Sequence, residues 1–225
     1  MTAYLFFLRL ARFSKAVWSF CFVLGVRLAA IVFVVLIPAG AGAQSLSGVH
    51  IGDNVRVTSR IGISPSTQNE IGPQTMLKWT FPDQNELSVT YLTATGRIEY
   101  IESDWGGDSR GSLSDFPNVT FGTTTLADLR KKFGSNGVSF EKSPDGSDAN
   151  GIFTSNSYEI VNTSVVVTFV TVIAALESLQ HHSEGPNATA NYMKVDAIML
   201  ADDTYLRKFW GKITADPAYR KIYWK

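Results

Sequence analysis

A short pattern occurs twice in this chain and constrains its architecture more than any other feature. In each copy an apolar residue and a glycine precede polar residues able to cap a helix, and a brief helical segment ends at a second glycine. The first copy begins at Ile51-Gly52 and ends at Gly62, and the second begins at Phe121-Gly122 and ends at Gly134. β-rich sequence with turn residues follows each copy. The pattern predicts one unit, a short helix followed by an antiparallel β-meander, that is used twice.

The first 43 residues have the composition of an export signal. They contain four basic residues and no acidic residue, namely Arg9, Arg12, Lys15 and Arg27. An apolar run over residues 28–37 follows, and the small residues Ala41-Gly42-Ala43 fit the site that a signal peptidase accepts. We expect cleavage after Ala43 and a periplasmic or secreted protein. The alternative is a retained membrane anchor, which the short apolar run and the charge of Arg27 disfavour.

Charge and cysteine content restrict the partners of the remaining chain. Removal of residues 1–43 leaves sixteen basic against twenty acidic residues. Nucleic-acid binding needs an excess of Lys and Arg, so we expect no nucleic-acid partner. Cys21 is the only cysteine and lies within the signal, so the mature chain has no disulfide and no thiolate for a metal ion. We expect no cofactor and no metal.

The first predicted unit comprises residues 44–113. We expect a short helix over residues 53–61 and a polar loop from Ser64 to Pro73. Alternation over residues 75–81 predicts a strand, and residues 86–93 and 97–104 complete the meander. The side chains expected to face the core are Leu77, Trp79, Phe81, Leu87, Val89, Tyr91, Ile98 and Tyr100.

The second predicted unit comprises residues 114–203 and follows a glycine-rich boundary segment. Thr125 and Asp128 match a capping box, and Leu126, Leu129 and Phe133 form the apolar stripe of a helix. We expect strands over residues 138–142, 151–161, 165–174 and 192–200. The third of these is rich in β-branched residues, which favours a strand at the centre of a sheet over a helix.

The second unit has an additional predicted loop over residues 179–190, which carries His181, His182 and Glu184. A metal site needs a third and usually a fourth ligand, and adjacent residues of an extended segment point in opposite directions. We therefore favour two solvated histidines. A small metal-dependent or hydrolytic enzyme that uses these histidines is the alternative.

Residues 204–225 form a basic tail interleaved with aromatic residues, among them Trp210 and Trp224. The spacing predicts a helical tail, in which a first helix is followed by a second short turn. The favoured interpretation is that its aromatic side chains complete the core. The alternative is a docking surface for an acidic partner or for anionic lipid headgroups, as in an envelope structural protein with peripheral membrane contact.

This arrangement resembles a known family. Ile51-Gly52, Gly62, Phe121-Gly122 and Gly134, together with the order of the strands, look like the tandem-repeat β-lactamase inhibitor proteins. Each unit is also similar to the small outer-membrane assembly lipoproteins of related fold. The resemblance implies an α+β fold of two tandem helix-plus-antiparallel-β-meander repeats that form a continuous or adjoining sheet, with a C-terminal helical tail. The disulfide that the inhibitors keep in each repeat, and the lipidated cysteine of the lipoproteins, have no counterpart in the mature chain.

The leading functional hypothesis is a non-catalytic exported module that binds another protein, in the manner of an inhibitor. Helices packed on one face of such a sheet leave the other face partly open, so exposed aromatic residues and loop tips would recognise the partner. The candidate binding residues are Trp105, Asp108 and Arg110 of the boundary segment and Trp210 and Trp224 of the tail, together with Trp79 and Tyr91 if the two faces of the strands are reversed.

Overall fold

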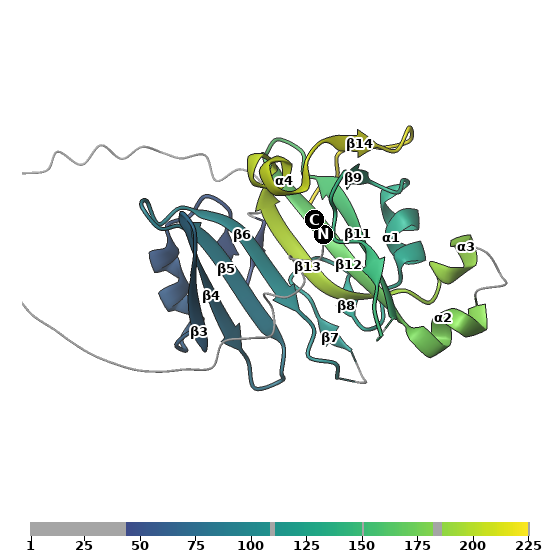
Figure 1. Ribbon diagram of the computed structural model, residues 1–225, viewed down its shortest axis with the longest axis horizontal. Helices are drawn as coiled ribbons and strands as arrows, with labels where there is room; N and C mark the ends of the chain where they lie inside the picture. Colours follow the sequence, from purple (N-terminus) through teal and green to yellow (C-terminus); the bar gives the residue numbers. More distant parts are fainter. Residues whose placement is uncertain (1–43, 109–110, 150, 182–185, 225) are drawn as a thin grey trace, which may run out of the picture. The chain divides into compact units, whose positions relative to one another are not determined.

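One large antiparallel β-sheet organises the protein (Figure 1). The computed structural model describes residues 44–108, 111–149, 151–181 and 186–224, all of which belong to one compact unit. Within this described part, ten strands form the sheet, and β10 (Gly146–Ser147) pairs with β11 beside the main path. The other nine follow the spatial order β14 (Ile213–Ala215), β9 (Val138–Phe140), β11 (Gly151–Glu159), β12 (Val165–Ala174), β13 (Lys194–Asp202), β6 (Ile98–Asp104), β5 (Glu86–Leu92), β4 (Gln74–Thr80) and β3 (Thr67–Ile71).

The strand order places two meanders side by side. Strands β3 to β6 run inward from one edge, and β9, β11, β12 and β13 run inward from the other side, so that β6 pairs with β13 between them. A hairpin and a short helix precede each meander. The chain is therefore an α+β protein built on a large antiparallel sheet, as the sequence predicts. The preceding elements are β1 (Ser45–Leu46), β2 (Val49–His50) and the 3-10 helix η1 (Val55–Ile61), and then β7 (Ser112–Leu113), β8 (Thr120–Phe121) and α1 (Leu126–Phe133).

Equivalent backbone hydrogen bonds hold the chain in place just before η1 and just before α1. The Gly52 N–H donates to the carbonyl of Ile98 at the start of β6, and the Gly122 N–H donates to the carbonyl of Val195 near the start of β13, both at 2.8 Å. Both glycines have positive φ, 91° and 68°. A side chain at either position would be strained, which explains why the sequence pattern has glycine there twice.

Similar residues cap both helices at their two ends. The side chain of Asn54 accepts a hydrogen bond from the backbone at the start of η1, and Thr125 forms the predicted capping box with Asp128 at the start of α1. Gly62 and Gly134 end the two helices in the left-handed conformation, with φ of 80° and 68°. The predicted helix over residues 53–61 is nevertheless of the 3-10 type and begins two residues later than expected.

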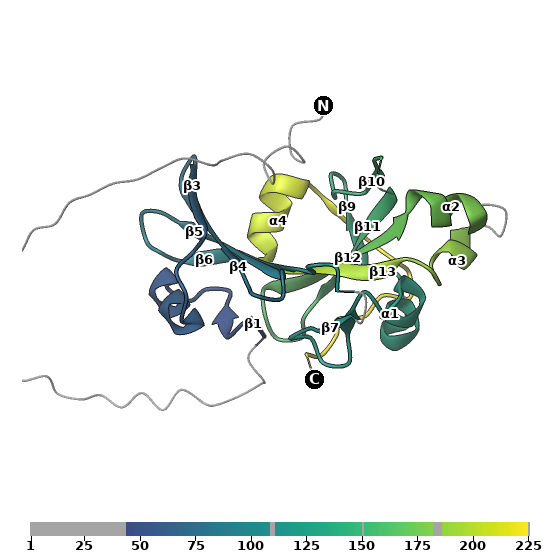
Figure 2. The same ribbon diagram turned by 90° about the horizontal axis from the view of Figure 1, so that it is seen from below.

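The largest hydrophobic core lies on one face of the sheet, which we call the packed face. Leu87 and Ile101 of the first meander and Val167 and Phe169 of the second belong to the same buried cluster. Figure 2 shows η1, the blue-purple helix, and α1 on this side of the sheet, with α4 on the other side. The core is therefore shared by the two meanders, because the sheet is continuous through the pairing of β6 with β13.

Most of the predicted inward side chains of the first unit do face this core. The fully buried ones are Leu77, Trp79, Leu87, Val89 and Ile98, and the partly buried ones are Phe81 and Tyr91.

Tyr100 is the exception, because a β-bulge interrupts the strand. Thr90 pairs with Tyr100 whereas Tyr91 pairs with Ile98, which leaves one extra residue in β6. The extra residue turns Tyr100 to the opposite face, where its ring lies 5.5 Å from that of Tyr205. The prediction that Tyr100 faces the core with Ile98 is therefore wrong.

Two predicted loops contain regular structure. Strand β3 lies within the expected loop from Ser64 to Pro73. It is an edge strand whose only neighbour in the described sheet is β4, and its mostly polar sequence has no alternation of apolar residues. The expected loop over residues 179–190 follows β12 through α2 (Ala175–His181) and includes α3 (Pro186–Thr189). These helices are short, and the exposed leucines of α2 gave no amphipathic pattern to detect.

Only the first part of the C-terminal tail is helical. Helix α4 (Asp203–Trp210) begins after the cap residue Asp202 and ends at Gly211. Ile213, predicted to share the helix, lies in β14, which pairs with β9. The expected second short turn does begin at Asp216-Pro217, where the Tyr219 N–H donates to the carbonyl of Asp216 at 2.8 Å, but the chain beyond it is extended and Ile222 forms a parallel bridge with Ile160. An available sheet edge thus outweighs the local helical pattern.

Residues 1–43, where the export signal is predicted, lie outside the described residues. Among the residues that are described, no helix combines the length and apolar character needed to cross a bilayer.

Candidate functional site

The face opposite the packed face carries the most unusual chemistry of the protein. Of the described helices, α4 packs on this face and covers one end of it through Leu206, which contacts Phe140 and Val166 (Figure 2). We call the remainder, over β4, β5 and β6, the open face; Ser88, Thr90 and Glu102 on it are buried, whereas Thr80 is exposed. The strand register places Lys78, Ser88 and Glu102 in one row across it, with Glu86 and Asp104 in the next row.

A pair of carboxyl groups lies at the centre of this face. Glu102 is only 8% exposed, although its side chain leaves the sheet on the side away from the core. Its carboxyl group accepts a hydrogen bond from the Tyr100 hydroxyl at 2.9 Å, and Asp104 lies two residues further along the same face of β6. Two neighbouring carboxyl groups that are removed from water do not readily ionise together. The pair therefore holds a proton to higher pH than ordinary carboxyl groups do.

Burial is the main cause of this proton retention. It raises the pKa of Glu102, and together with the charge of Glu102 it raises the pKa of Asp104 to about 9. Burial also raises the pKa of Asp196, whose charge acts on Asp104. We call Glu86, Glu102, Asp104 and Asp196 the carboxyl cluster. The charge of Lys78 lowers the pKa of both members of the pair, and Lys78 is itself ion-paired with Glu86.

The hydroxyl of Ser88 is left without a partner inside this arrangement. Ser88 is 1% exposed and stands opposite both Lys78 and Glu102 in the strand register. Its Oγ has no hydrogen bond to any described residue. A buried hydroxyl normally finds a partner, so an unpaired one beside the carboxyl pair marks an unused hydrogen-bonding position on this face.

The structure does not gather the predicted binding residues of the boundary segment into a site. Trp105 is partly buried against the core, and a Cβ on Gly122 would lie 2.3 Å from its indole ring. Asp108 is half-buried, and its carbonyl accepts from the Gly111 N–H at 2.9 Å. Arg110 lies outside the described residues. Trp105 therefore fills space between structural elements rather than projecting as an anchor.

The other candidate aromatic residues also serve packing. Trp79 is 1% exposed, and its indole N–H donates to the carbonyl of Ile63 at 3.1 Å. Tyr91 is partly buried against the same core. Trp210 and Trp224 make edge contacts with aromatic rings, with centroids 5.6 Å from Phe140 and 4.5 Å from Phe116 respectively.

The two described histidines, His181 and His50, each contact a different residue. His181 ends α2, and its ring stacks on that of Tyr192 at 3.5 Å. His50 contacts the carboxylate of Asp53 at 3.0 Å. His182 and Glu184 lie outside the described residues. Among the described side chains, no group of three or more His, Cys, Asp and Glu is placed to hold a metal ion.

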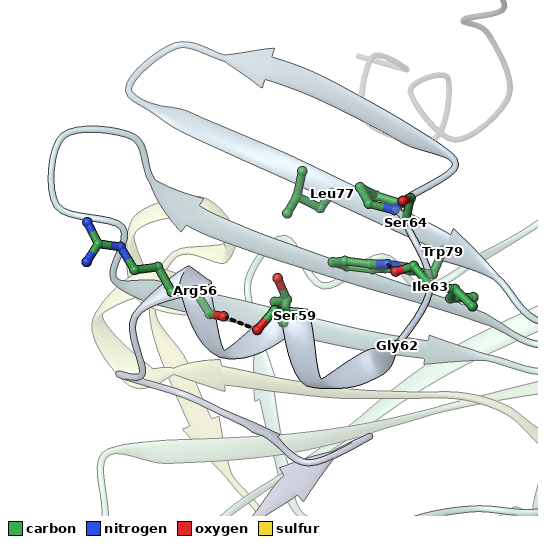
Figure 3. A pocket seen from close by; sticks show the side chains of 9 residues that line it. Arg56, Ser59, Gly62, Ile63, Ser64, Leu77 and Trp79 are labelled. Carbon is green, nitrogen blue, oxygen red and sulfur yellow. Dashed lines mark hydrogen bonds between the residues drawn. The ribbon is translucent and has the colours of Figure 1, made fainter. Parts of the chain in front are cut away.

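A shallow pocket of 450 Å³ lies between η1 and β4 on the packed side (Figure 3). Three of its polar side chains are engaged by backbone carbonyl groups. The Ser59 hydroxyl donates to the carbonyl of Arg56, the Thr58 hydroxyl donates to that of Val55, and the Trp79 indole is bonded as described above. In Figure 3 the Arg56 guanidinium points away from Trp79 and Leu77. The pocket is lined by Arg56, Thr58, Ser59, Gly62, Ile63, Ser64, Pro65, Leu77 and Trp79.

Sequence reasoning missed the carboxyl cluster, although one signal for it was present. Tyr100, Glu102 and Asp104 alternate on a strand that the sequence places at the end of a meander, and alternating polar residues usually indicate a solvated face. Only the pairing of β6 with β13 makes this strand central and its polar face partly buried. Comparisons with models of protein families, with curated proteins and with solved structures find no match to this chain.

Proposed function

We propose that this chain is a non-catalytic exported module that binds another protein on the open face of its sheet. The sheet is fully packed on one side and covered by a described helix at only one end of the other side. Two of the four groups of the carboxyl cluster form a protonated pair on the open face. Burying ionisable groups destabilises a fold unless they are paired, so such groups are retained where they serve recognition or catalysis.

A duplicated architecture, which we also propose, would suit this function. The equivalent backbone bonds of Gly52 and Gly122, the caps of η1 and α1, and the mirrored order of the two meanders are what one unit used twice would produce. Duplication would yield a broad sheet with two helices on one side. A protein partner would then meet a wide, rigid surface, which suits binding better than an enclosed substrate site does.

The observation that carries the proposal is the carboxyl pair on the open face. Hydrolysis would require neighbouring metal ligands, a histidine base or an enclosed cavity. Among the described residues, the carboxyl pair has none of these beside it. Its surroundings range from the buried Ser88 and Thr90 through the half-buried Met76 and Glu86 to the exposed Thr80, and this outer part is the contact surface that a partner would meet.

The test is capture of a partner by chain 44–225 from a periplasmic extract, compared between two arginine variants. Thr80→Arg places a bulky cation on the exposed part of the open face, and Gln68→Arg places the same group on the other side of the sheet edge. We expect Thr80→Arg to lose the captured protein and Gln68→Arg to keep it. Equal capture by both variants would contradict binding on the open face.

Export and membrane contact are tested separately by fractionation. We expect the mature chain to begin at Gln44 and to be recovered with periplasmic or secreted proteins. Peripheral membrane contact through the tail predicts that deletion of residues 215–225 releases the protein from envelope fractions. Because Trp224 and Ile222 pack against the core, the melting temperature of the deletion variant must be measured alongside.

A further inference from the structure

We infer that the carboxyl cluster is the seat of a basic side chain, an arginine or a lysine, presented by the partner protein. This inference rests on the proposed function and specifies the chemistry of the partner. It follows from the charges that face the cluster, from the unpaired Ser88 hydroxyl and from the breadth of the surface around them.

The charges facing the cluster do not balance. Strand β4 contributes Lys78, β5 contributes Glu86, β6 contributes Glu102 and Asp104, and the adjoining β13 contributes Asp196. The remaining titratable neighbours, Tyr100 of β6 and Tyr205 of α4, bring hydroxyl groups and no positive charge. One described lysine thus faces four carboxyl groups, and Glu86 already binds it. A second cation is what this arrangement lacks.

Ser88 supplies the independent observation. Its hydroxyl is buried, stands directly opposite Glu102 and has no partner among the described residues. The oxygen of this hydroxyl can accept a hydrogen bond from an N–H group, and an arriving guanidinium or ammonium group brings such donors. The same cation would favour the ionised form of the neighbouring carboxyl groups by direct attraction.

The surface around the cluster favours a protein side chain over a free cation. The described residues do not place three ligands around one point, so a metal ion is not indicated. Beside the cluster lie Met76 and Thr80 on β4 and the ring of Tyr100, which give a protein segment apolar and polar contacts on both sides of its basic residue. An arginine fits best, since its planar guanidinium can bind two carboxyl oxygens together.

Binding of a cation then expels the retained proton. The pair holds this proton at neutral pH because burial raises the pKa of Asp104 to about 9. A cation beside the pair lowers that pKa and releases the proton to the buffer. Proton release distinguishes this seat from a general attraction between an acidic protein and a basic peptide, because exposed carboxylates have no proton to release at neutral pH.

The experiment is isothermal titration calorimetry of chain 44–225 with hexa-arginine, in two buffers of different ionisation enthalpy at neutral pH. The double amide variant Glu102→Gln with Asp104→Asn removes the titrating groups and keeps their shape. Glu70→Gln, at an exposed position on the edge strand, removes one negative charge elsewhere. We expect release of close to one proton from the unmodified chain and from Glu70→Gln. The double amide variant should bind about tenfold to a hundredfold more weakly and release none.

Other probes identify the source of the cation. Hexacitrulline, which has the shape of hexa-arginine without its charge, should not bind measurably. Spermidine binding as tight as that of hexa-arginine would overturn the inference in favour of a free polyamine. Equal affinity and equal proton release in the double amide and Glu70→Gln variants would also overturn it. Circular dichroism and urea unfolding of each variant establish that a loss of binding does not come from a loss of structure.

Capture from extract separates this inference from the proposed function. A partner that is lost with Thr80→Arg but kept by the double amide variant would uphold binding on the open face and contradict a basic side chain in the carboxyl cluster. A partner kept by Thr80→Arg would contradict the proposed function itself, whatever the peptide titration gives.

Discussion

Removal of the two buried carboxyl groups should stabilise the protein and change the pH dependence of its stability. The perturbation is the double amide variant, Glu102→Gln with Asp104→Asn. In the unfolded chain these carboxyl groups titrate near pH 4, whereas the folded chain keeps Asp104 protonated up to about pH 9. Between these values the folded state binds a proton that the unfolded state lacks. The free energy of unfolding therefore falls as the pH rises.

The magnitude follows from the number of protons retained. One retained proton lowers the free energy of unfolding by about 1.4 kcal/mol for each unit of pH. From about pH 5 to about pH 8 this amounts to roughly 4 kcal/mol, a large share of the stability of an ordinary domain. Carboxyl groups with lowered pKa, such as Asp128 and Asp202, change stability only at lower pH, as the pH falls through their own pKa values.

The assay is urea unfolding followed by tryptophan fluorescence at several pH values across this interval, for the unmodified chain and the double amide variant. The difference between the two proteins cancels the contributions of all other groups. We expect this difference to grow with pH and the variant to be the more stable protein at the alkaline end. Parallel pH profiles of the two proteins would refute the reasoning, because they would mean that the pair holds no extra proton in the folded state.

Four further substitutions test the packing, each by urea unfolding. Thr125→Ala removes the capping box of α1 and should lower the free energy of unfolding by about 1 kcal/mol; no change would mean that the cap adds nothing. Gly122→Ala should cost at least roughly 2 kcal/mol, because its Cβ would lie 2.3 Å from the Trp105 ring at a φ of +68°. Leu129→Ala should cost about 2 to 5 kcal/mol, whereas Leu179→Ala, which alters a side chain that is 75% exposed, should stay within about 0.5 kcal/mol; similar losses in both would contradict the assigned core.

Features that depend on neighbours along the chain were predictable from the sequence. Helix α1 forms where Thr125 and Asp128 match a capping box and Gly134 permits the left-handed end, and all of these contacts are local. The alternation in β4 placed Leu77 and Trp79 correctly on the packed face, because successive side chains of a strand always point to opposite sides.

Features that depend on which strands meet were not predictable. β3 has too little apolar alternation to be recognised, and it forms because β4 offers it a row of backbone partners. The helix of the tail ends at Gly211, because the residues after it pair as β14 with the edge of β9. The local sequence pattern does not reveal this pairing.

The sequence by itself determined the local elements of this protein, namely two glycine-led helix starts, their caps and the strands that follow them, because those depend on residues a few positions apart. Only the tertiary structure decided the candidate site. The pairing of β6 with β13 and the bulge before Tyr100 bring Glu102 and Asp104 onto a partly buried surface. The degree to which a carboxyl group is removed from water depends on what surrounds it in space, and so does its capacity to keep a proton and to attract a cation.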